Sequence, residues 1–125
     1  MSTTTFPEHA RQVAELLNEL LKVGHISAFD LKIDQRSTLR GFVKGQVNFS
    51  NGSELYFREF VDTTLAESKI MYVYHYQASD GTLVFRYDNA IHRPPLSQPE
   101  HKHTSDNVSI SGIPTLQQVL DEILR

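Results

Sequence analysis

The sequence predicts an α+β domain, in which an antiparallel sheet of about five strands packs one face against an N-terminal and a C-terminal helix. Apolar residues recur at helical spacing near both ends of the chain, and between these ends they alternate with polar residues, as in half-buried strands. The dipeptides Asn51-Gly52 and Asp80-Gly81 separate such runs and are typical of hairpin turns. At a length of 125 residues, we expect residues 1–125 to form one domain.

The first helix is predicted over residues 6–23. Thr5 followed by Glu8 has the spacing of a capping box, and Pro7 suits a first helical turn. Gly24 is a typical residue at which a helix ends. We expect residues 1–5 to form a disordered tail. The apolar stripe of this helix, which indicates a packing face, consists of Ala10, Val13, Ala14, Leu17, Leu20 and Leu21.

Three strands follow, near residues 29–34, 39–49 and 53–61. The loop at Asn51-Gly52 decides which residues of the second hairpin share a face. A two-residue loop would bury a carboxylate or expose Phe49, whereas an odd loop with Gly52 in a bulge places Val47 and Phe49 on the face of Leu55 and Phe57. We therefore predict the odd loop.

The odd loop also places Glu59 on the apolar face of its strand. Two interpretations stay open. Glu59 lies at a frayed sheet edge in water, or it is a partly buried carboxylate paired with a cation.

A further hairpin is predicted from residues 70–77 and 82–88, joined by an even loop at Asp80-Gly81. This loop would align Tyr72, Tyr74 and Tyr76 with Leu83, Phe85 and Tyr87 on one apolar face. We expect the helices to cover this face, which makes the tyrosines core residues rather than a platform for nucleobases. The opposite face carries His75, Gln77, Arg86 and Asp88.

Residues 91–106 contain three prolines and no periodicity, which predicts a long loop. Val108 and Ile110 indicate a short extra strand. Pro114 and Thr115 precede a helix predicted over residues 114–125, whose apolar stripe is Leu116, Val119, Leu120, Ile123 and Leu124.

Four of the six histidines lie between residues 75 and 103, close to cations and carboxylates. Histidine exchanges protons near neutral pH, and arginine or lysine can bind a phosphate. These are the parts of a metal-independent ribonuclease that needs no cofactor. The catalytic candidates are His101, His103, His75, Asp88 and Glu59. The substrate-binding candidates are Arg86, Lys102 and His92.

Other interpretations of these residues compete. Residues 101–103 can be a solvated polar run, and Arg86 with Asp88 can be a structural ion pair. His101 and His103, completed by His92 or Asp88, can hold a metal ion, but no spacing here matches a known zinc signature, and we predict no metal site.

Composition excludes several classes of protein. The chain has no cysteine, which excludes disulfides, thiolate zinc sites and cysteine nucleophiles and suits a cytoplasmic protein. It has no apolar run of about 20 residues and no signal-peptide pattern, so no membrane association is expected. Its net charge of −3 means that any binding of RNA or DNA would have to be local.

Several motifs resemble the TumE-like toxin family over roughly residues 28–125. They include Asn51-Gly52-Ser53, Tyr74-His75-Tyr76-Gln77, Phe85-Arg86-Tyr87-Asp88-Asn89-Ala90, His92, Pro99, His101-Lys102-His103 and the closing Pro114, Leu116, Val119-Leu120 and Glu122-Ile123. The resemblance implies the growth-inhibiting toxin of a prokaryotic type II toxin–antitoxin pair, with a small DNA-binding antitoxin as partner. It implies no mechanism, so an RNA substrate rests on the residue chemistry above. The alternative is a non-catalytic module that docks a protein or nucleic acid through its polar sheet face and histidine loop.

Overall fold

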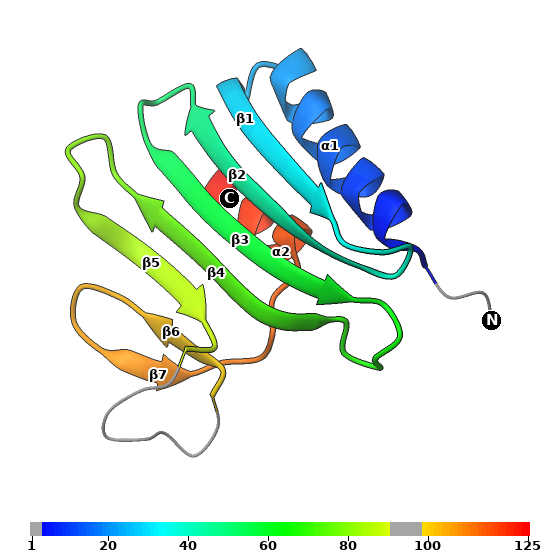
Figure 1. The fold of residues 1–125 in the computed structure, drawn as a ribbon. Helices are drawn as coiled ribbons and strands as arrows, with labels where there is room; N and C mark the ends of the chain where they lie inside the picture. The colour runs from blue at the N-terminus through cyan, green and yellow to red at the C-terminus, as the bar shows by residue number, and fades with distance from the viewer. Residues whose placement is uncertain (1–3, 91–98) are drawn as a thin grey trace.

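The computed structural model describes residues 4–90 and 99–125, and it consists of one antiparallel sheet with two helices (Figure 1). The strands neighbour one another in the sheet in their sequence order. The elements are α1 (Phe6–Lys22), β1 (Ile26–Gln35), β2 (Arg40–Phe49), β3 (Glu54–Asp62), β4 (Lys69–Gln77), β5 (Leu83–Asp88), β6 (His101–His103), β7 (Val108–Ile110) and α2 (Leu116–Leu124).

Both helices begin at capping residues that the sequence indicates. The Thr5 side chain accepts a hydrogen bond from the Glu8 amide, so Thr5 is an ordered cap of α1 rather than part of a disordered tail. Gly24 follows α1 with a φ of +84°, a conformation that favours glycine. α2 starts two residues later than predicted, behind a capping box of Thr115 and Gln118. Neither helix, within the described residues, is long and apolar enough to span a membrane.

Both helices cover the same face of the sheet, as predicted. The buried residues of α1 and α2 form one core with Tyr74, Tyr76 and Phe85 of the hairpin β4–β5. Hydrogen bonds from α1 to Glu59 and from Tyr87 to α2 reach the sheet from this same side. In Figure 1, α1 lies beside β1 and α2 lies behind the middle strands. We call the opposite side of the sheet the open face.

The predicted register of the hairpin β2–β3 is confirmed. Val47 lies opposite Leu55, and the loop between the strands has three residues and ends on Gly52, whose φ is +89°. This loop places Glu59 in the core, where it is 2 % exposed, so the frayed-edge interpretation is wrong.

The predicted even loop of the hairpin β4–β5 is wrong, although most of its pairing is right. Ala78 and Thr82 pair around a three-residue loop that ends on Gly81, and an irregularity between Tyr76 and Gln77 then shifts the register by one. Consequently Tyr74 lies opposite Tyr87 and Tyr76 opposite Phe85 as predicted, whereas Leu83 lies opposite Gln77. The two irregularities offset each other, because the apolar side chains must stay on one face.

In the part of the chain that the structure describes, the sheet has seven strands rather than about five. β7 is the short strand predicted at Val108 and Ile110, but β6 lies inside the segment predicted to be a loop. Its three residues are all polar, so no apolar alternation marks them. Their strand conformation follows from pairing with the edge of β5, which is a contact distant in sequence.

Candidate functional site

Pairing of β5 with β6 assembles four of the predicted site residues. Asp88 lies opposite His101, and Arg86 lies opposite His103. Residues two apart on a strand share a face, so all four lie on the open face, away from the helices. We call Arg86, Asp88, His101 and His103 the Asp88 cluster.

The Asp88 carboxylate is the centre of this cluster. Its Oδ1 lies 2.6 Å from His101 Nε2 and accepts a 3.2 Å hydrogen bond from the Ala90 amide. Its Oδ2 accepts a 2.8 Å hydrogen bond from Arg86 Nε and lies 3.7 Å from His103 Nε2. The Asp88 side chain is only 3 % exposed, and these polar partners replace the water that a carboxylate loses on burial.

His101 is buried and held at both ring nitrogens. Its Nδ1 lies 2.6 Å from the Pro99 carbonyl oxygen, which can only accept, so Nδ1 carries a hydrogen. Nε2 lies 2.6 Å from a carboxylate oxygen of Asp88, which is within hydrogen-bond distance. The buried His101 thus orients the Asp88 carboxylate.

A second row of side chains crosses three adjacent strands on the open face. His75 lies opposite Arg86, and Arg86 lies opposite His103. The side chains of Arg86 and His103 are 39 % and 25 % exposed, so a bound molecule can reach them. His75 Nε2 lies 3.1 Å from Gln77 Oε1, and its buried Nδ1 has no hydrogen-bond partner among the described residues. This row places one histidine on each side of a cation.

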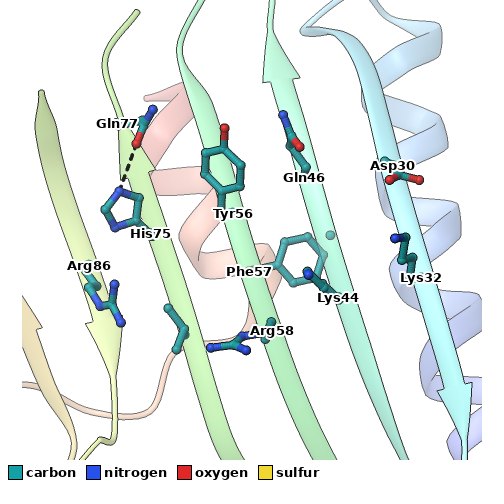
Figure 2. Close-up of a pocket in the computed structure, with 12 residues that line it drawn as sticks. Asp30, Lys32, Lys44, Gln46, Tyr56, Phe57, Arg58, His75, Gln77 and Arg86 are labelled. Atoms are coloured by element: carbon teal, nitrogen blue, oxygen red, sulfur yellow. Dashed lines mark hydrogen bonds between the residues drawn. The ribbon is translucent and has the colours of Figure 1, made fainter. Parts of the chain in front are cut away.

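The row opens on a hollow of about 550 Å³ on the open face, which Figure 2 shows with His75 and Arg86 at one side. Lys32, Lys44 and Arg58 also line it. The sequence interpretation did not select these three cations. The alternation along β1, β2 and β3 was the signal that could have found them, because it places each cation on the face of the sheet that the apolar residues do not occupy.

The structure does not bring Glu59 into this site. Glu59 lies on the helix-covered face, with its Oε1 2.8 Å from His9 Nε2 and its Oε2 3.8 Å from Lys69 Nζ, and it accepts a hydrogen bond from Tyr74. Burial raises the pKa of Glu59, but the hydrogen bonds from His9 and Tyr74 and the charge of Lys69 outweigh burial and lower this pKa overall. Glu59 is thus the paired buried carboxylate of the second interpretation.

Two further candidates also stand apart from the cluster. Lys102 lies between His101 and His103 on β6, so alternation turns it to the helix-covered face, where its Nζ donates to Glu122 of α2 at 2.9 Å. Burial lowers the pKa of Lys102, and its hydrogen bonds to Glu122 and Tyr87 raise it overall. His92 lies outside the described residues.

The trio Asp88, His101 and His103 has its nitrogen and oxygen ligand atoms within 4.8 Å of one another, a spacing that could hold a metal ion. Imidazole and carboxylate ligands suit a divalent transition metal, and the Pro99 carbonyl would orient His101 as such sites require. The Arg86 guanidinium, however, already forms an ion pair with the Asp88 carboxylate, and its positive charge would repel a metal cation. We therefore carry forward the interpretation in which His101 and Asp88 are held by a direct hydrogen bond.

A model of the family described as toxin TumE matches residues 13–125 of this chain. Neither the curated proteins nor the solved structures contain a match. The matched residues include all seven strands, α2 and the complete Asp88 cluster.

Proposed function

The chain belongs to the TumE toxin family, and from this premise we propose that it is the toxin of a type II toxin–antitoxin pair and cleaves RNA without a metal ion. Its partner in this proposal is a DNA-binding antitoxin, and its site of action is the cytoplasm, where RNA is available. The observation that supports the cleavage is the row His75–Arg86–His103 across β4, β5 and β6.

The row has the geometry for phosphoryl transfer. Strands are about 4.8 Å apart, so the two histidines stand roughly 10 Å apart with Arg86 midway between them. A phosphate bound at Arg86 would have one imidazole on each side. The Asp88 hydrogen bond uses one of the five guanidinium donors of Arg86 and holds its position.

The reaction needs only these groups. One histidine removes the proton of the ribose 2′-hydroxyl, the 2′-oxygen bonds to phosphorus, and the bond from phosphorus to the 5′-oxygen breaks. The other histidine gives its proton to that leaving oxygen, and Arg86 stabilises the charge of the transition state. The products are a 2′,3′-cyclic phosphate and a 5′-hydroxyl. His101 acts through Asp88 as a positioning residue, because it is buried.

Cleavage of a labelled single-stranded RNA by the purified chain, with and without chelator, tests this proposal. His103→Gln should lower the rate by roughly 10²- to 10⁴-fold without lowering the thermal midpoint. Arg86→Gln should lower the rate by a similar factor. Because this variant also loses a hydrogen bond to the buried Asp88, its rate is measured below its own thermal midpoint. His25→Gln, at an exposed histidine ahead of β1, is the matched control and should cleave normally. Full cleavage by both cluster variants would refute the catalytic row.

The role of His101 has a separate readout. His101→Gln should shift the pH profile of cleavage, because it removes a titratable partner of the Asp88 carboxylate, which itself contacts Arg86 and His103. A lower thermal midpoint with an unchanged pH profile would mean that His101 is purely structural.

Toxicity is tested in a bacterial host. Expression of this chain alone should slow growth, and expression of its genomic neighbour should relieve the effect. If His103→Gln slows growth as strongly as the native chain, toxicity comes from docking a partner rather than from cleavage.

A further inference from the structure

We propose that the open face binds single-stranded RNA along a row of three cations, Lys32, Lys44 and Arg58, which leads to the Asp88 cluster. This inference rests on the proposed function, because it names how the substrate of that site is held. We call the three residues the basic row.

The register of three strands creates the basic row. Lys32 of β1 lies opposite Lys44 of β2, which lies opposite Arg58 of β3. The same row continues through Val73 of β4 to Asp88 of β5. At a strand spacing of about 4.8 Å, the three cations span roughly 10 Å, and the line through them across the sheet leads to the cluster. All three are exposed, and Figure 2 shows them at the hollow.

The charges of this row favour a polyanionic ligand. Like charges directly opposite each other on neighbouring strands destabilise a sheet, and the basic row contains two such pairs. Within residues 4–90 and 99–125, none of its members has a salt bridge to a carboxylate. Among the described residues that line the hollow, Asp30 is the one carboxylate, in a chain whose net charge is −3. A nucleic-acid backbone would supply the missing negative charge.

A parallel row next to the basic row offers ring faces to bases. Gln46 lies opposite Tyr56, and Tyr56 lies opposite His75. The Tyr56 side chain is exposed, and its ring centroid lies 6.4 Å from that of His75. Aromatic rings on an open sheet stack with the unpaired bases of a single strand, which a duplex does not present. The phosphates would follow the basic row, and the bases would lie on Tyr56 and His75.

A protein partner fits this hollow less well. The core of a protein–protein interface is usually apolar and depleted of charge, whereas the hollow has four cations along its lining. Several exposed apolar residues of the open face lie outside the hollow. Phe42 and Met71 belong to a neighbouring row, and Val108 and Ile110 lie on β7, opposite His103 and His101. We therefore favour RNA over the antitoxin as the occupant.

Binding is measured separately from cleavage with a labelled 12-nucleotide RNA in which every ribose is 2′-O-methylated, so that no 2′-hydroxyl can attack. Fluorescence anisotropy with the full chain gives its affinity over a series of salt concentrations. The double variant Lys44→Gln/Arg58→Gln should bind at least 10-fold more weakly. The slope of its log affinity against log salt should be smaller by about 1.4, since each lost phosphate contact removes about 0.7.

The matched control is Arg11→Gln/Lys22→Gln, which makes the same charge change at exposed positions of α1. This control should keep the native affinity and slope. Tyr56→Ala should weaken binding by roughly 10-fold, as expected for loss of one stacked base. Thermal midpoints measured on each variant confirm that it is folded.

The outcomes separate this inference from the proposed function. If the native chain binds the methylated RNA through the basic row but cleaves no RNA, the inference holds and the proposed function fails. If the row variant binds this RNA as tightly as the control does, the inference is overturned, even if cleavage persists. Loss of antitoxin binding in the row variant, with native RNA affinity, would instead assign the surface to the antitoxin and also overturn the inference.

Discussion

Replacement of Glu59 by glutamine tests the buried polar network under α1. Glu59 Oε2 lies 3.8 Å from Lys69 Nζ, and the two side chains are 1 % and 8 % exposed. Glu59→Gln is almost isosteric, so it removes the negative charge without opening a cavity. The ammonium of Lys69 then stays buried beside a neutral amide.

The size of the effect follows from these contacts. Removal of one partner of a buried ion pair typically destabilises a protein by about 3–5 kcal/mol. Lys69 Nζ retains hydrogen bonds to the Tyr74 hydroxyl, at 2.7 Å, and to the Pro114 carbonyl, which favours the lower end of about 3 kcal/mol. For a chain of this length, a loss of this size lowers the thermal midpoint by about 12 °C.

Urea unfolding at several pH values is the appropriate assay. Because the pKa of Glu59 is lowered in the folded state, its stabilising contribution is fully present above the unfolded pKa of about 4.3 and is lost as the pH falls through the folded pKa. The native protein should therefore lose more stability on acidification than Glu59→Gln does. Lys69→Met in the Glu59→Gln background should recover part of the loss, since it removes the uncompensated charge.

Glu8→Gln is the control, because Glu8 is an exposed residue 3.9 Å from Arg11 and should change stability by less than about 0.5 kcal/mol. If Glu59→Gln is as stable as Glu8→Gln at neutral pH, Glu59 is not a buried counter-charge and our account of the network is wrong.

Three further outcomes are expected. Gly45→Ala should destabilise the fold by about 1–3 kcal/mol in urea unfolding, because a Cβ at this position would clash with the Phe57 ring. Gly112→Ala is the control and should be neutral, because a Cβ there would meet nothing within 4 Å. Tyr76→Ala should lower the free energy of unfolding by about 3 kcal/mol or more, because it removes a buried ring. Tyr76→Phe loses only the 2.8 Å hydrogen bond to Ser53 and should lower it by about 1 kcal/mol in the same measurement. Chelator should leave the rate of RNA cleavage unchanged if the Asp88 cluster works by proton transfer, and a chelator-dependent loss restored by one divalent metal would assign the cluster to that metal instead.

Local patterns in the sequence determined much of this protein. The apolar stripes and caps of the two helices depend on residues three and four apart, and the hairpin at Gly52 depends on one glycine with a positive φ. Alternation along β4 and β5 placed His75, Arg86 and Asp88 on the face opposite the core. Each of these features arises from interactions within a few residues, so the sequence contains its signal directly.

Tertiary structure alone decided the composition of the site. His101 and His103 reach Asp88 only because β6 pairs with the edge of β5, and the same pairing turns Lys102 to the other face. Glu59 was placed on the apolar face by its register, but α1 and β4 supply the His9, Tyr74 and Lys69 that keep its charge in the core. The basic row joins Lys32, Lys44 and Arg58 from three strands. Such neighbours are distant along the chain, and their separation in space is set by the packing of the whole sheet. No local periodicity in the sequence therefore encodes this separation.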